Sequence, residues 1–327
     1  MGLTELYQKG EELLRQRDIG VFLDGVETGF ILSHDRRILD RYTFRQRCID
    51  AVESNTRCHV LGAELATPVI MSAITTPIPA IVENGLMEVA LALKEVGSLV
   101  WTGSVIPKNL KEIVQLGVPV AANVKPLEDR KKLFRALDEF QEAGVNWVGI
   151  EIDAALGTKI GDEPKATGCA PLSMKELQEI RKKVSGPLIF KGILSRTDAM
   201  KSVDAGADGI MVSNHGAHTL DYLPHPLQVM DEIVSEVSGK VAIMVEGGFR
   251  RGSDVLKGLA FGASLVGIGR PILYGLAADG REGVKGVVNG VTQELKRIMT
   301  LVGAPEPGRV PRDILIADQC DFGDVID

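Results

Sequence analysis

The chain has 327 residues, of which 45% are hydrophobic and 25% charged, and its formal net charge is −7. This composition is ordinary for a globular protein, and the length suits one large α/β barrel or two average domains. The acidic balance argues against nucleic-acid binding, which needs clustered basic residues. No apolar run is long enough to span a membrane. Four scattered cysteines without CxxC spacing favour reduced thiols in the cytoplasm over a disulfide framework or a metal cluster.

Residues 1–66 are predicted to form a helical segment that packs on the rest of the chain. Their first stretch, MGLTELYQKGEELLRQRD, is amphipathic and charged. A signal peptide needs a longer apolar core than this, so the chain is expected to stay in the cytoplasm. Residues 305–327 are expected to form a C-terminal tail, whose end, ADQCDFGDVID (317–327), is acidic and predicted to be frayed.

Between these segments, short apolar runs alternate with amphipathic stretches, many of which end in glycine. Near-continuous apolar strands are typical of a parallel sheet that is buried on both faces. Eight strand–helix units within residues 67–304 predict a (β/α)8 TIM barrel. A doubly wound sheet shares the alternation, but no GxGxxG follows the first strand. The predicted strands are 67–73, 98–103, 119–124, 146–153, 187–193, 209–215, 241–247 and 264–269.

Functional groups of such a barrel gather at the carboxyl ends of the strands. The stretches EGGFRRGSD and GIGRP end the last two strands and predict a phosphate site, because glycine lets backbone N–H groups approach an anion and arginine adds charge. Lys191 ends a buried strand, so it needs either a carboxylate partner or a functional role. Two functional roles stay open for Lys191: it forms a Schiff base with a substrate, or it faces an electron-rich cofactor. His215 follows another strand, and Asp153 is placed to orient it as a general base.

The order and spacing of several motifs resemble a known family. The motifs are KGILSRTDA, SNHGAHTLDY, EGGFRRGSDVLKGLAFGA and GIGRPILYGLA. They resemble those of the FMN-dependent α-hydroxy acid oxidases and dehydrogenases, such as glycolate oxidase, lactate oxidase and flavocytochrome b2. The resemblance extends over about residues 40–305 and implies that FMN is the cofactor.

The resemblance also implies roles for single residues. His215 is the base, Asp153 its carboxylate partner, and Lys191 the residue beside the part of the flavin that gains charge on reduction. The residues expected around FMN are Ser72, Ala73, Ser104, Glu151, Lys191, Ser213, His215, Gly216, Glu246, Gly247, Gly248, Arg250, Gly269 and Arg270. The residues expected to contact the substrate are Asn123, Lys159 and His218.

The chain departs from the family pattern on the substrate side. His218 stands where the family has a carboxylate-binding arginine, and a second such arginine is replaced by Lys159 or Thr158. Arginine and lysine are not interchangeable where a planar carboxylate is gripped, so the sequence predicts a divergent substrate. Glu151 stands where the family has threonine beside the flavin. It either faces the flavin or pairs with Lys125 or Lys159 and turns away.

The sequence therefore predicts an FMN-dependent oxidoreductase in which hydride passes from a small-molecule substrate to the flavin, with oxygen or a redox partner as the electron acceptor. Two other functions stay open. One is a redox-neutral FMN enzyme of the type 2 isopentenyl-diphosphate isomerase kind, although the expected metal-binding glutamine–glutamate pair is missing. The other is a flavin-binding protein without turnover. No metal is expected, and the family resemblance implies a homo-oligomer.

Overall fold

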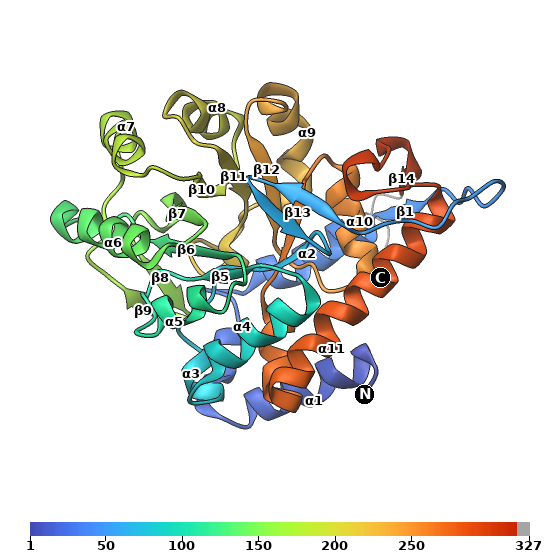
Figure 1. Cartoon of the computed structure of the whole chain (residues 1–327), viewed down its shortest axis with the longest axis horizontal. Coiled ribbons are helices and arrows are strands. Elements are labelled where there is room, and N and C mark those ends of the chain that lie inside the picture. Colours follow the sequence, from blue (N-terminus) through green and yellow to red (C-terminus); the bar gives the residue numbers. More distant parts are fainter. Residues whose placement is uncertain (319–327) are drawn as a thin grey trace, which may run out of the picture.

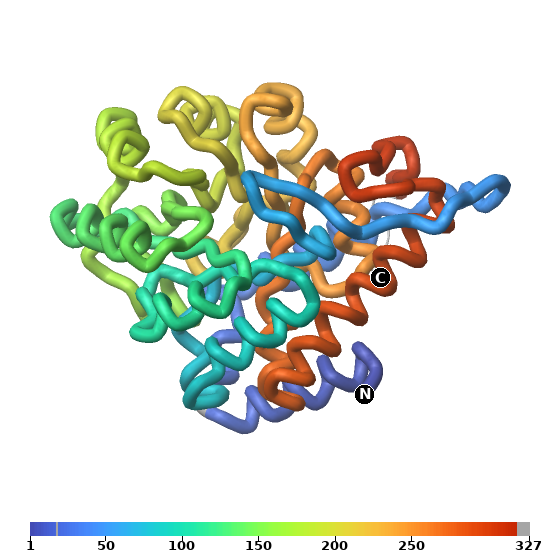
Figure 2. Tube along the Cα trace, viewed as in Figure 1, coloured from blue at the N-terminus to red at the C-terminus, as the bar shows by residue number. Residues whose placement is uncertain are grey.

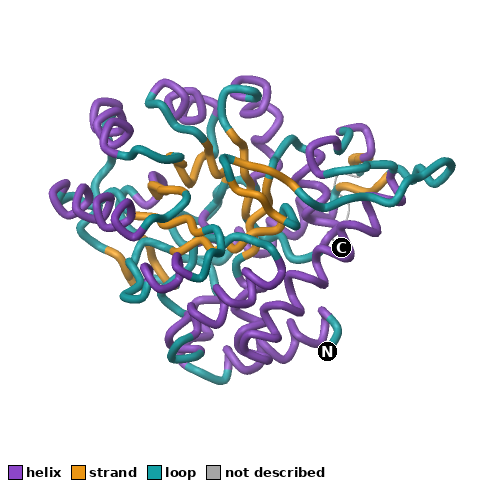
Figure 3. Tube along the Cα trace, in the orientation of Figure 1, coloured by secondary structure: helices purple, strands orange, loops and turns teal. Residues whose placement is uncertain are grey.

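The computed structural model describes residues 1–318, and its centre is a single sheet of eight parallel strands (Figure 3). Two hydrogen bonds join the edges of the sheet and close it into a barrel. Met71 N–H donates to Leu99 O at 3.3 Å, and Ile74 N–H donates to Trp101 O at 3.2 Å. The predicted TIM barrel and all eight predicted strands are confirmed. In sheet order the strands are β4 (Val69–Met71), β13 (Leu265–Ile268), β12 (Ala242–Glu246), β11 (Gly209–Val212), β10 (Leu188–Ile193), β7 (Trp147–Glu151), β6 (Val120–Val124) and β5 (Val100–Thr102).

Helices surround the strands on the outside (Figure 1). Their ends follow local sequence signals: the Asp129 carboxylate accepts hydrogen bonds from Lys131 N–H and Lys132 N–H at the start of α6, and Gly144 ends α6 in a left-handed conformation. No helix of the described chain is long and apolar enough to cross a membrane. The helices that follow the strands are α3 (Ile78–Ile81), α4 (Gly85–Val96), α5 (Leu110–Gln115), α6 (Arg130–Ala143), α7 (Met174–Lys183), α8 (Arg196–Asp204), α9 (Pro226–Val237), α10 (Gly252–Ala260) and α11 (Arg270–Val302).

The buried apolar residues fall into two clusters. The larger one fills the space between the strands and the outer helices. The smaller one includes Trp101 and Trp147, whose rings meet edge to face, and contains inward-facing residues of all eight strands. Because successive strand residues point to opposite faces, alternate positions of the barrel strands share this interior.

The N-terminal segment holds more than the predicted helices. Helix α1 (Leu3–Arg15) packs along α11, and α2 (Phe30–Asp40) follows it. The strands β2 (Cys58–Val60) and β3 (Ala63–Leu65) form a hairpin whose apolar side chains join the interior cluster, and Leu61 O accepts a hydrogen bond from the Trp147 indole at 3.0 Å. In Figure 2 this light-blue hairpin crosses in front of the barrel strands. It closes the barrel interior at the end opposite the strands' carboxyl termini.

The described part of the C-terminal tail is ordered. Strand β14 (Leu315–Ala317) pairs antiparallel with β1 (Tyr42–Phe44), so a small sheet joins the C-terminal tail to the N-terminal segment. The tail before the predicted frayed end is ordered because β1 offers a free strand edge, and the frayed end itself, 317–327, falls almost wholly outside the described residues. Residues 319–327 lie outside the described residues.

An ion pair with a buried carboxylate ties the N-terminal segment to the loop after β12. The Arg36 guanidinium on α2 donates two hydrogen bonds to the Asp254 carboxylate, at 3.0 and 2.8 Å. The Asp254 side chain is 1% exposed and also accepts hydrogen bonds from the backbone N–H groups of Arg250 and Arg251. Asp254 thus holds both the loop and α2 in place.

We expect Asp254→Ala to lower the free energy of unfolding by about 3 kcal/mol, because it leaves a partly buried guanidinium and two backbone donors without their acceptor. Urea denaturation measures the change. The control is Asp231→Ala, which removes an exposed ion pair with Arg312 and should cost under about 1 kcal/mol. Equal effects of the two variants would contradict the role assigned to Asp254.

Candidate functional site

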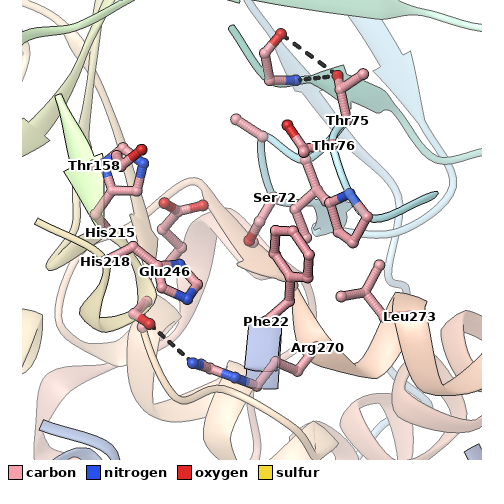
Figure 4. Close-up of a pocket in the computed structure, with 18 of the residues that line it drawn as sticks. Phe22, Ser72, Thr75, Thr76, Thr158, His215, His218, Glu246, Arg270 and Leu273 are labelled. Carbon is pink, nitrogen blue, oxygen red and sulfur yellow. Dashed lines mark hydrogen bonds between the residues drawn. The ribbon is translucent and has the colours of Figure 1, made fainter. Parts of the chain in front are cut away.

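A cavity of about 300 Å³ lies at the carboxyl ends of the barrel strands. Figure 4 shows His215 and His218 on one side of it, Phe22 and Leu273 on the other, and Arg270 at the lower end of the view. Each barrel strand contributes to the lining, either with one of its own residues or with a residue of the turn that follows it. After β11, this residue is His215. The cavity is where a barrel of this class is expected to carry its chemistry.

The polar floor of the cavity continues the inward-facing rows of the barrel. Two residues after the buried Ile189 comes Lys191, and two after Met244 comes Glu246. Two after Met211 comes Ser213, which is fully buried. The period of two along each strand therefore turns the top layer of the barrel interior from apolar to polar.

His215 is held by a carboxylate and by an unusual backbone. Its Nδ1 lies 2.7 Å from Asp153 Oδ2. His215, Gly216 and Ala217 all have positive φ, of 57°, 60° and 68°, a left-handed turn that non-glycine residues adopt at a cost. Gly192 makes room for the partner, since a Cβ there would lie 2.0 Å from the Asp153 Cγ. Such strain, maintained by the surrounding fold, fixes the imidazole at the cavity wall.

Glu151 forms a buried ion pair beside this histidine. Lys125 Nζ donates to Glu151 Oε2 at 2.6 Å and to Ser104 Oγ at 2.8 Å, while Asn123 Nδ2 donates to Glu151 Oε1 at 3.3 Å. Burial alone would raise the pKa of Glu151, but the nearby charges, first that of Lys125, outweigh it and hold the pKa below its ordinary value. The predicted pairing with Lys125 is confirmed, yet Glu151 still lines the cavity.

Lys191 and Glu246 form a second buried pair. Lys191 Nζ lies 3.0 Å from Glu246 Oε1, which also accepts a hydrogen bond from Ser213 Oγ at 2.7 Å. Burial opposes the charge of Lys191, but the carboxylates of Glu246, Asp153 and Glu151 raise its pKa. Within the described chain, neither Lys191 Nζ nor Glu246 Oε2 has a well-aligned hydrogen-bond partner. Both atoms are therefore free to bond to a ligand.

The other end of the cavity is positively charged. Gly248, Arg250, Gly269 and Arg270 line it, as the phosphate prediction requires. Arg270 donates to Leu23 O and to Gly216 O, both at 2.9 Å, which anchors its guanidinium. A Cβ on Gly248 would lie 2.8 Å from the Asp35 Cβ, so only glycine leaves the backbone room there.

Asp35 joins this end from α2 and was not predicted from the sequence. It is 4% exposed, lines the cavity, and accepts a hydrogen bond from Asn214 Nδ2 at 2.8 Å. Burial raises its pKa from 3.8 to about 7, although the hydrogen bond from Asn214 and the charges of Arg270 and Arg250 oppose the shift. No local pattern in α2 marks Asp35, because the segment that carries it reaches the site only through the tertiary fold.

A small hairpin after β7 contributes the remaining wall. It consists of β8 (Thr158–Ile160) and β9 (Glu163–Ala166), and Thr158, Lys159, Ile160, Lys165 and Ala166 line the cavity. Lys159 Nζ lies 3.3 Å from Glu27 Oε1 at the surface. His218 faces the same space, and burial lowers its pKa to about 3, so its ring is neutral.

Most residues predicted for the site do line the cavity. Three do not: Asn123, Asp153 and Ser213. Asp153 and Ser213 support His215 and Glu246 from behind. Asn123 was predicted to contact the substrate, but it is fully buried between the Trp101 indole, which donates to it at 2.7 Å, and Glu151. It orients Glu151 and is screened from the cavity.

The sequence of the chain was compared with those of known protein families. The chain matches the family described as FMN-dependent dehydrogenase over residues 12–167 and 162–317. The chain belongs to the FMN-dependent dehydrogenase family. This membership confirms FMN as the cofactor and an oxidoreductase as the class of enzyme, at the level of the family.

Relatives within the family are named for 2-hydroxy acids. Glycolate oxidase 3 of Arabidopsis thaliana is 29% identical over 95% of both chains, and L-lactate oxidase of Lentilactobacillus hilgardii is 29% identical over 93% of this chain and 90% of that protein. A peroxisomal (S)-2-hydroxyacid oxidase of Arabidopsis thaliana is 48% identical, but the match spans only 44% of this chain and 40% of that protein. Among solved structures, mandelate oxidase has a TM-score of 0.85 at 28% identity, covering 96% of this chain and 97% of that one.

The residues present fit FMN. The free ammonium hydrogens of Lys191 and the unpaired Glu246 Oε2 suit a polar ring and its polyol chain, and the glycine-and-arginine end suits a phosphate. The cavity volume lies at the lower limit of ordinary ligand sites, which span roughly 300–1,000 Å³. Lys191, Glu246, Gly248, Arg250 and Arg270 are the residues that would hold the group.

We expect Arg250→Ala to weaken FMN binding about tenfold to a hundredfold, because it removes a charge-assisted contact with the phosphate. Fluorescence titration of FMN into the cofactor-free protein measures this. Arg251→Ala is the matched control: the neighbouring arginine pairs with Glu294 and is absent from the lining, so FMN affinity should hold. An unchanged affinity in Arg250→Ala would show that the phosphate lies elsewhere.

Asp35 predicts a pH dependence of stability in the FMN-free protein. Its folded-state pKa of about 7 exceeds the ordinary 3.8, so the folded chain binds the extra proton between these values. The stability that this proton provides is full below pH 4 and is lost as the pH rises through 7. Asp35→Asn should therefore flatten the fall in unfolding free energy over this range. Urea denaturation across pH tests it, with Asp231→Asn as control; a slope unchanged by Asp35→Asn would refute the assignment.

Proposed function

We propose that this chain is an FMN-dependent oxidoreductase that oxidises a small molecule at a carbon whose heteroatom carries an exchangeable proton, with His215 as the base. The observation that supports this most is the His215–Asp153 pair at the wall of the cavity. FMN, when bound, supplies the two-electron acceptor that takes hydride from the substrate. Side chains of the protein accept the substrate proton and stabilise the charge that develops during the reaction.

The histidine is set to accept a proton at Nε2. Burial tends to raise the pKa of Asp153, but His215 and Lys191 outweigh it and keep the pKa low, so the carboxylate is ionised and only accepts hydrogen bonds. The proton of the neutral imidazole therefore sits on Nδ1, and Nε2 keeps a free lone pair. Once Nε2 takes a proton, Asp153 stabilises the resulting imidazolium.

Lys191 places a positive charge at the floor of the cavity. Its ammonium is 2% exposed and is held ionised by the surrounding carboxylates. A fixed charge in a site with little water stabilises negative charge that appears nearby during the reaction. Lys191 thus favours the reduced form of the bound cofactor electrostatically.

The substrate side supports a divergent substrate. Away from the phosphate end, six charged residues of the described chain line the cavity: Lys125, Glu151, Lys159, Lys165 and the Lys191–Glu246 pair at its floor. The neutral His218 stands where the family resemblance expects an arginine. A lysine-lined wall that also holds a carboxylate differs from a site built to grip one carboxylate with arginines.

The remaining parts of the proposal come from the sequence and the family. We place the protein in the cytoplasm as a homo-oligomer, with oxygen or a redox partner as the electron acceptor. The relatives named for hydroxy acids support a small-molecule substrate.

We expect His215→Asn to keep FMN bound while reduction of the flavin by substrate slows by about 10²- to 10⁴-fold, the usual loss when a general base is removed. Anaerobic mixing with candidate substrates, followed by the flavin absorbance, measures the rate. His59→Asn, an exposed histidine on the opposite-end hairpin, is the control and should leave the rate unchanged.

Two outcomes would overturn this function. Reduction at the wild-type rate in His215→Asn would remove the base assignment. A wild-type flavin that no candidate substrate bleaches, in a protein that still converts or only binds them, would favour the redox-neutral or non-catalytic alternative.

A further inference from the structure

Two hydrogen-bond acceptors face each other at the cavity wall. His215 Nε2 lies 4.0 Å from Glu151 Oε2. Both residues line the cavity, and both are held from behind, His215 by Asp153 and Glu151 by Lys125 and Asn123. Their positions are therefore set by the protein before any substrate arrives.

Neither atom offers a hydrogen to the other. The imidazole proton lies on Nδ1, toward Asp153, so Nε2 of the neutral ring is an acceptor. Glu151 is paired with the Lys125 ammonium at 2.6 Å and is ionised, so its oxygens are acceptors only. Oε2 takes one hydrogen bond from Lys125 and has a second lone pair for another donor.

The spacing selects the donor. A single atom can lie about 2.8 Å from each of two acceptors that are 4.0 Å apart, which is ordinary hydrogen-bond length. To bond both, that atom needs two hydrogens. A hydroxyl has one, so a hydroxyl donated to His215 would turn its oxygen lone pairs toward the Glu151 carboxylate. An ammonium has three, and its charge also complements the carboxylate.

We propose that the substrate presents a primary amino group to His215 and Glu151, so that the site is selective for amines over the corresponding alcohols. This inference rests on the function proposed above and names its substrate class. The amine is that of a 2-amino acid or of a simple primary amine. Lys159 and Lys165 on the hairpin wall suit the carboxylate of the first kind.

The reaction balances with the groups already named. The substrate binds as the ammonium and gives one proton to His215 Nε2, and the neutral amine so formed then gives up hydride from its α carbon to FMN. The C–N single bond becomes the C=N double bond of an iminium ion, and two electrons leave the substrate. Water then hydrolyses the iminium ion to a carbonyl compound and ammonium. Glu151 stays ionised throughout and is a specificity-determining residue.

The first experiment measures binding without turnover. 2-Aminoisobutyrate and 2-hydroxyisobutyrate differ only in the heteroatom, and neither has a hydrogen on the α carbon to lose as hydride. Each is titrated into the FMN-loaded protein, and the dissociation constant is read from the change in the flavin spectrum. We expect the amine to bind at least about tenfold more tightly, the usual worth of a hydrogen bond to a charged group.

The variants test whether Glu151 causes this preference. The double variant Lys125→Met, Glu151→Leu removes both buried charges together, which usually preserves the fold better than leaving one unpaired. It should lose the preference for the amine, and Glu151→Gln should reduce it. Glu64→Gln, an exposed carboxylate on β3, is the control and should retain it. Circular dichroism and FMN content establish that each variant is folded.

A second arm separates this inference from the proposed function. Anaerobic bleaching of the flavin is compared for alanine against lactate and for benzylamine against benzyl alcohol, pairs with and without a carboxylate. Tighter binding of the amine without bleaching by any compound supports the inference and contradicts the function. Faster bleaching by the alcohols, tighter or equal binding of the hydroxy analogue, or binding of neither analogue overturns the inference. A preference for amines that survives in the double variant overturns the role of Glu151.

Discussion

The structure of the site depends on one constraint: a charge inside the barrel must have a partner of opposite sign. Removing an ion from water costs several kcal/mol, so an isolated ammonium or carboxylate at this depth would neutralise or destabilise the fold. The chain meets the constraint with two ion pairs, Lys191 with Glu246 and Lys125 with Glu151. Asp153 is held by its hydrogen bond with the neutral His215 and by the nearby charge of Lys191. These interactions keep three acids ionised where a cofactor and substrate meet.

Much of this arrangement could be predicted from the sequence. The eight strands were visible because a parallel barrel buries both faces of each strand, and long apolar runs record that directly. The residues at the strand ends followed from the same runs, which is why His215, Lys191 and Glu246 were placed correctly in the cavity. Family motifs then supplied roles that residue types alone left open.

What the sequence left out depends on contacts between distant segments. Asp35 reaches the phosphate end from α2, and its position depends on Asn214, which lies 179 residues further along. The hairpin β8–β9 has no strong strand signal, because it is largely exposed and holds Pro164 and several charged residues. Asn123 was predicted to contact the substrate, and it does lie near the end of its strand. Its side chain does not reach the cavity, because it is enclosed between the Trp101 indole and Glu151.

Glu151 shows how two alternatives drawn from a sequence can both hold in part. The sequence offered two positions for the Glu151 side chain: it faces the flavin, or it pairs with a lysine and turns away from the flavin. In the fold, Lys125 and Asn123 approach Glu151 from β6 and the residue after it, and His215 lies on the opposite side across the cavity wall. The pair therefore fixes the carboxylate in its ionised form while Glu151 still lines the cavity. A buried ion pair is weak evidence for stability, because apolar residues of similar volume often serve as well. Its presence beside the base is better explained by what an ionised and immobile acceptor can select.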